Sequence, residues 1–69
     1  MRSLIVLTNK DNPADVLYLK KFGNSDITLT EKKEEALKIG SKLTFDKYFS
    51  MAEMMYSDKY FIESIEVKD

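Results

Sequence analysis

Apolar residues recur along this chain at two spacings, one typical of strands and one typical of helices. Residues 3–8 carry the unbroken aliphatic run Leu4-Ile5-Val6-Leu7, which predicts a buried strand. Asn, Asp and Pro dominate residues 9–13, so a loop is expected there. A second strand is predicted over residues 15–22, and the connection between the two strands is long enough to close an antiparallel hairpin.

The second predicted strand divides its side chains between two faces, because successive residues of a strand point in opposite directions. One face is expected to hold Val16, Tyr18, Lys20 and Phe22, and the other Leu17, Leu19 and Lys21. Residues 23–26 predict a turn, since Gly23 and Asn24 both adopt positive φ at little cost. A short third strand is expected over residues 27–29.

Two helices are predicted after the third strand. The first spans residues 31–39, with Thr30 as its N-cap and Gly40 as its C-cap glycine. The second spans residues 45–57, with Thr44 as its N-cap, and gives the strongest periodic signal in the chain. Its apolar stripe comprises Phe45, Tyr48, Phe49, Ala52, Met55 and Tyr56.

A last strand is expected over residues 60–68. Phe61 and Ile65 alternate in phase, whereas Ile62 falls on the opposite face, so either both faces are partly covered or a bulge near residues 62–64 resets the phase. The carboxylates of Glu63, Glu66 and Asp69 are expected to form a charged edge that discourages association between strands.

These elements predict a single small α+β domain over residues 1–69, in the order β-β-β-α-α-β. We expect a mainly antiparallel sheet of three to four strands with two helices packed on one face. The other face of the sheet would then be left open.

The composition narrows the chemistry available to this domain. The 69 residues include no cysteine and no histidine, which removes thiolate nucleophiles, disulfides and the commonest general base. No glycine-rich phosphate loop or nucleophile motif is present. The alternating charges of residues 31–38 are interpreted as a solvated helix face. We therefore expect no enzyme, no catalytic residues, no cofactor and no metal site.

Location and charge follow from the same counts. A cysteine-free chain of this size favours a reducing compartment, and its longest apolar run is four residues, so a cytoplasmic protein without a membrane segment is expected. Eleven basic and twelve acidic residues give a formal charge of −1, which provides no strong field to attract nucleic acid.

Met51, Met54 and Met55 are candidate partner-binding residues, because methionine is flexible and suits surfaces that accept different partners. Helical spacing places Met55 on the apolar stripe and the other two beside it. Met51 and Met54 therefore belong either to the core or to a patch for a partner or a second copy. A homodimeric structural domain, paired through this helix or the open sheet face, is one alternative function.

Tyr18, Lys20 and Lys21 are further candidates, because with Phe22 they combine aromatic and basic side chains on one strand. Single-stranded nucleic-acid binders use this composition for stacking and phosphate contact. The competing interpretation is a half-exposed strand with its rings in the core, which the slightly negative net charge favours. A nucleic-acid-binding module using residues 18–22 remains an alternative function.

Three stretches carry a resemblance to known proteins: Leu17-Tyr18-Leu19-Lys20, Leu29-Thr30-Glu31 through Ala36-Leu37-Lys38, and Ile62-Glu63-Ser64-Ile65-Glu66-Val67. In topology, the chain resembles small phage-borne or prophage-borne proteins of unknown function. They share a tyrosine-containing strand, a threonine-capped acidic helix, a second helix and a closing strand of acidic and aliphatic residues. The methionine-rich second helix departs from that pattern, and the resemblance implies no catalytic residues.

The expected function is a non-catalytic protein-binding or regulatory accessory protein. Small size, missing catalytic chemistry and the methionine-rich helix lead to this expectation. The resemblance suggests that a phage or another mobile element encodes it and that its partner is a host protein.

Overall fold

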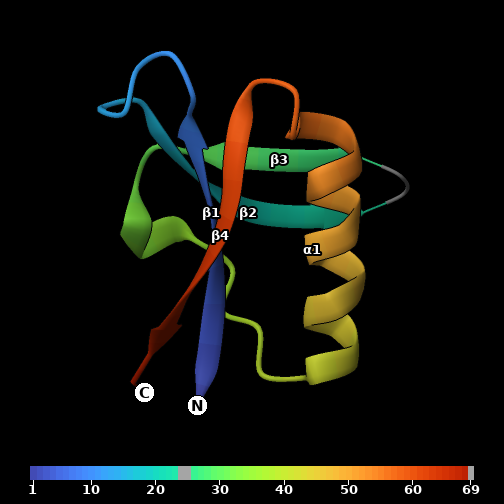
Figure 1. The fold of residues 1–69 in the computed structure, drawn as a ribbon. Helices are drawn as coiled ribbons and strands as arrows, with labels where there is room; N and C mark the ends of the chain where they lie inside the picture. The colour runs from blue at the N-terminus through green and yellow to red at the C-terminus, as the bar shows by residue number, and fades with distance from the viewer. Residues whose placement is uncertain (24–25, 69) are drawn as a thin grey trace.

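The computed structural model describes residues 1–23 and 26–68, which form a four-stranded antiparallel sheet and one long helix (Figure 1). The strands are β1 (Arg2–Asn9), β2 (Val16–Gly23), β3 (Asp26–Thr30) and β4 (Tyr60–Val67). A short 3-10 turn, η1 (Lys33–Glu35), and the helix α1 (Lys42–Tyr56) lie between β3 and β4. The spatial order is β3-β2-β1-β4, so β3 and β4 are the edge strands. Asn24 and Ser25, the middle of the predicted turn, and Asp69 lie outside the described residues.

The prediction of two helices is wrong, because residues 31–39 form only η1 and an extended segment. Ser3 and Ile39 exchange two backbone hydrogen bonds of 2.9 Å, and the Leu37 N–H donates to the Leu19 carbonyl at 2.9 Å. These bonds to β1 and β2 use backbone groups that a helix would pair internally, and a helix this short is marginal without packing. The element order is therefore β-β-β-α-β, with η1 before the helix.

The helix begins at Lys42 rather than Phe45, because Ser41 caps it instead of Thr44. The Ser41 hydroxyl oxygen accepts a hydrogen bond from the Thr44 N–H at 3.3 Å. Gly40, predicted as the C-cap of a preceding helix, lies instead in the connection between the Ile39 bridge and this cap.

A β-bulge at Lys20 changes which side chains of β2 face the helix. The register passes from Leu19 opposite Leu29 to Lys21 opposite Thr28, so Lys20 is an extra residue on β2. Leu19 and Phe22 consequently share the core face, whereas simple alternation placed Phe22 with Tyr18. The predicted alternation holds up to Leu19 and is wrong beyond it.

Strand β4 pairs with β1 without any register shift, from Tyr60 opposite Asn9 to Val67 opposite Arg2. Two alternatives were predicted for this strand. The prediction of a bulge near residues 62–64 is wrong, and the prediction that both faces of the strand are partly covered is confirmed. Ile62 packs against the core on the helix side, and Ile65 lies opposite Leu4 on the other side.

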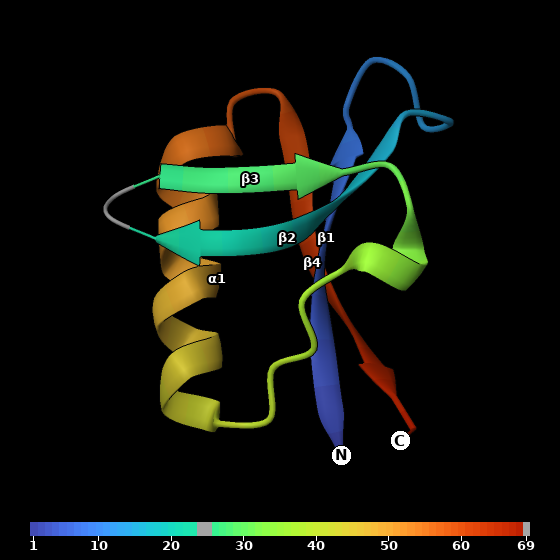
Figure 2. The ribbon, with the colours of Figure 1, turned by 180° about the vertical axis from the view of Figure 1, so that it is seen from behind.

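The sheet bends, so that β2 and β3 cross the β1–β4 pair at a steep angle and α1 lies against both (Figures 1 and 2). The turn η1 lies on the other side of β1 and β4 from α1. The buried core between sheet and helix comprises Ile5, Leu7, Leu19, Ile27, Ile39 and Ala52. Leu4 and Val6, on the face predicted to be open, are also buried, so that face is partly covered.

Candidate functional site

The six candidate residues do not form one site, because they lie on two sides of the sheet. Met51, Met54 and Met55 belong to α1, which covers the core face. Tyr18 points away from the helix, since its neighbours Leu17 and Leu19 pack in the core. Lys20 and Lys21 follow Tyr18 in β2, and both are exposed.

The β2 candidates do not form a continuous aromatic and basic surface. The Phe22 ring stacks on Tyr48 of α1 with 4.3 Å between centroids, so it is held in the core. Tyr18 is half-buried beside Val6 on the opposite face. The Lys20 amine lies 3.3 Å from a carboxylate oxygen of Glu35. Because the bulge separates the two rings, no one face of β2 offers both of them to a nucleic-acid base.

The helix positions of the methionines decide their exposure. Ala52 is fully buried, and Met54, two residues further on, points to nearly the opposite side of the helix, where it is 81% exposed. Met55 is 43% exposed at the border of the buried stripe, and Met51 packs partly against the core. Of the two residues left open by the sequence, Met51 thus borders the core and Met54 belongs to the surface.

A hollow of about 330 Å³ opens beside Met55, where α1 ends and β4 begins. It is lined by Met55, Tyr56, Asp58, Lys59 and Tyr60. The rings of Tyr56 and Tyr60 meet edge to face, with 6.2 Å between centroids and 86° between planes. We call Met55, Tyr56 and Tyr60, together with the exposed Met54 next to Met55 on α1, the methionine surface. Met54 itself lies away from the hollow, because Tyr56, two residues further on, points to nearly the opposite side of the helix. The methionine surface combines flexible thioethers with aromatic rings, and charged groups lie at its border.

Tyr60 is the residue of this surface that sequence reasoning missed. Its predicted place was the first residue of a strand, which gave no reason to join it to the helix. A signal was nevertheless present, because Tyr56 and Tyr60 flank a short polar connection at residues 57–59 and are therefore close in space.

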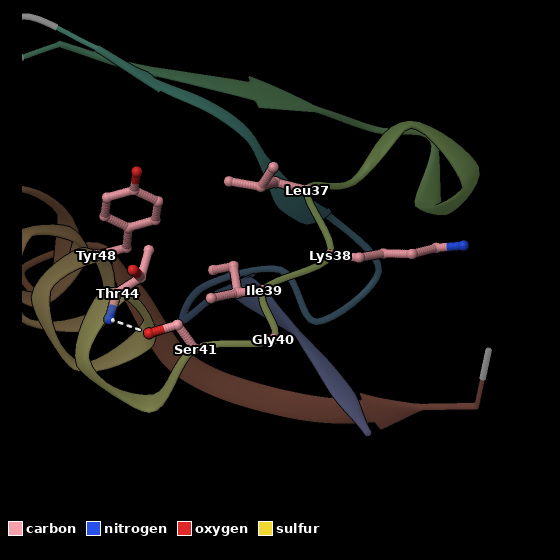
Figure 3. A pocket seen from close by; sticks show the side chains of 7 residues that line it. All are labelled: Leu37, Lys38, Ile39, Gly40, Ser41, Thr44 and Tyr48. Carbon is pink, nitrogen blue, oxygen red and sulfur yellow. Dashed lines mark hydrogen bonds between the residues drawn. The ribbon is translucent and has the colours of Figure 1, made fainter.

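A second hollow, of about 270 Å³, lies near the N-terminal end of α1 (Figure 3). Leu37 points toward Tyr48 across it, whereas the Lys38 side chain points away. Its one drawn hydrogen bond joins Ser41 to the Thr44 N–H and serves as the helix cap. This hollow is therefore a feature of how the connection packs on the helix.

Within residues 1–23 and 26–68, no group of three Asp or Glu side chains is placed to hold a metal ion. In the same part of the chain, no helix is long and apolar enough to cross a bilayer. Comparison of the chain with known protein families, curated proteins and solved structures finds no match. The methionine surface is thus the strongest candidate site.

Proposed function

We propose that this chain is a non-catalytic accessory protein that binds another protein through the methionine surface. One observation carries the proposal: Met55 is 43% exposed at a hollow that Tyr56 and Tyr60 also line, and Met54, next to Met55 on the helix, is 81% exposed. Covering such side chains is favourable by roughly 1.5–3 kcal/mol for each one fully buried. A partner that seats an apolar side chain in the hollow would gain this energy.

The chemistry of the surface suits a protein partner. Methionine and tyrosine are enriched in the centres of protein interfaces, and polar groups form their rims. Here Asp58 and Lys59 lie at the edge of the hollow and provide both signs of charge. The partner expected is therefore an apolar protuberance with polar neighbours.

The proposal includes a cytoplasmic setting, a phage or another mobile element as the source, and a host protein as the partner. The cysteine-free composition supports the first of these. The topological resemblance noted for residues 17–67 suggests the other two. The nucleic-acid alternative loses its main support, because the Phe22 ring is stacked in the core.

Photo-crosslinking from position 54 tests the proposal. A photoreactive amino acid replaces Met54 in one protein and Leu43 in a matched control. Leu43 is 84% exposed on the outer side of the same helix, about three turns away. In lysate of the host cell, we expect a discrete protein adduct from position 54 and none from position 43.

Two results would contradict the proposed function. One is the same set of adducts from positions 54 and 43, which would show non-specific contact. The other is the absence of any adduct from position 54 when the probe itself is incorporated and the protein is folded.

A further inference from the structure

Strand β4 has an outer edge that pairs with no strand of the described sheet. Its inner edge is paired to β1 along the whole strand, and in Figure 1 it is the strand nearest the viewer, with no element in front of it. Most of its side chains are exposed to solvent. It contains neither a proline nor a bulge, two features that commonly protect edge strands from pairing.

The register shows which backbone groups of β4 point outward. The Lys10 N–H donates to the Lys59 carbonyl at 2.9 Å, which makes Lys10 and Lys59 a hydrogen-bonded pair. Bonded and non-bonded pairs alternate along an antiparallel ladder. Ser3, which lies opposite Glu66, exchanges its backbone hydrogen bonds with Ile39 on the other side of β1 instead. This makes Ser3 and Glu66 a non-bonded pair, as the alternation requires. The residues whose N–H and C=O groups point away from the sheet are Tyr60, Ile62, Ser64 and Glu66.

We propose that β4 pairs antiparallel with β4 of a second copy of this chain, about a two-fold axis at Ser64. The partner is a second copy because the strand complements itself. In an antiparallel pair, residues directly opposite each other point to the same face of the sheet, so the two-fold axis must pass through a residue rather than between two residues. Near the middle of β4, this residue is Glu63, Ser64 or Ile65. An axis at Glu63 would set two carboxylates directly opposite, which is destabilising. An axis at Ile65 would pair only residues 63–67 of the strand.

The Ser64 register pairs residues 61–67 and avoids every contact between like charges directly opposite. Glu63 meets Ile65 and Glu66 meets Ile62, so neither glutamate has a carboxylate directly opposite, and the two Glu63 residues lie on a diagonal, about 7–8 Å apart. Phe61 meets Val67. Three outward-facing positions, Ile62, Ser64 and Glu66, give about six hydrogen bonds between the copies.

The same register covers apolar side chains that are partly exposed, among them Phe61, whose ring has the Lys10 amine 5.3 Å from its centroid. Phe61 is 54% exposed and Ile65 is 37% exposed, on the face opposite the helix. In the dimer each of them gains a cross-strand neighbour from the other copy, which adds to the stability of the pairing. The result is a sheet that continues through both copies.

Light scattering on the full chain tests the dimer. We expect a dimer in the micromolar range and an increase of at least about tenfold in its dissociation constant for Ser64→Pro. Because the Ser64 N–H points outward in both copies, proline removes two hydrogen bonds of the dimer and leaves the pairing with β1 intact. Ser64→Ala is the matched control and is expected to keep the dimer, and circular dichroism checks that both variants are folded.

Cysteine cross-linking tests the register and does not depend on the proline variant. The chain has no cysteine, so Ser64→Cys introduces one thiol per copy. At the axis the two Cα atoms would lie about 5.5 Å apart, within disulfide range. Glu66→Cys is the control, because its two copies would lie roughly 13 Å apart along the strands. We expect a linked dimer from Ser64→Cys only.

Several outcomes would overturn this proposal: a monomer at every concentration up to about millimolar, a dimer unchanged by Ser64→Pro, or equal linkage of the two cysteine variants. A dimer lost in Met54→Glu but kept in Ser64→Pro would place the contact on α1 and overturn it as well. The first three of these results leave the photo-crosslinking from position 54 untouched, because it reports a different surface. In the last case, the adduct from position 54 would be a linked pair of copies of this chain.

Discussion

Ser41 and Thr44 show how a single side chain sets the start of a helix. Both residue types are good N-caps, and Thr44 directly precedes the apolar stripe, so local spacing favoured Thr44. The structure selects Ser41, because the Ile39 bridge to Ser3 holds the chain extended up to that point. The sequence pattern could not reveal this choice, since it depends on a contact with the first strand.

Replacing each of these two residues by alanine tests the assignment of the cap. We expect Ser41→Ala to lower the free energy of unfolding by about 1 kcal/mol, because the bond to the Thr44 N–H is lost. Thr44→Ala is expected to change it by less than about 0.5 kcal/mol, since Thr44 lies inside the helix, where alanine is the better helix former. Urea denaturation measures both, and the opposite ranking would refute Ser41 as the cap.

At the scale of elements, the strands and the main helix were predictable because each carries its own periodic signal. The extended segment after η1 was not predictable, because its charged residues suit a helix locally. Only its backbone hydrogen bonds to β1 and β2 hold it extended. The bulge at Lys20 was equally hidden, because it appears only in the pairing with β3. For the candidate site, the sequence predicted Met54 and Met55 as partner-binding residues from their spacing on the helix. It left open whether Met54 is exposed.

The role of the bulge at Lys20 in placing Phe22 on the core face of β2 can be tested. Inserting one alanine between Thr28 and Leu29 gives Lys20 a partner, forces the strand into a regular register and turns Phe22 away from Tyr48. We therefore expect a loss of at least about 2 kcal/mol in the free energy of unfolding. Lys20→Ala keeps the bulge and removes only an exposed ion pair, so it should cost no more than about 0.5 kcal/mol. Equal stability of the two variants in urea would show that the bulge does not position Phe22.

At the scale of the whole molecule, a chain of 69 residues cannot bury all its apolar side chains. The large apolar residues left exposed are Met1, Leu43, Met54, Met55, Phe61 and Ile65. The last four fall on the two surfaces proposed for partners, the methionine surface and β4. A small domain gains stability from any partner that binds only its folded state, so both associations are expected to raise the midpoint of thermal unfolding.

The most direct test of the central claim, that the methionine surface binds a protein, is an affinity measurement with the partner captured from position 54. Calorimetry compares the original chain with Met54→Glu and with Leu43→Glu, two equivalent changes at exposed positions of α1. We expect Met54→Glu to weaken binding at least about tenfold and Leu43→Glu to change it less than about twofold. Equal affinity of all three proteins, or an equal loss in both variants, would contradict the central claim.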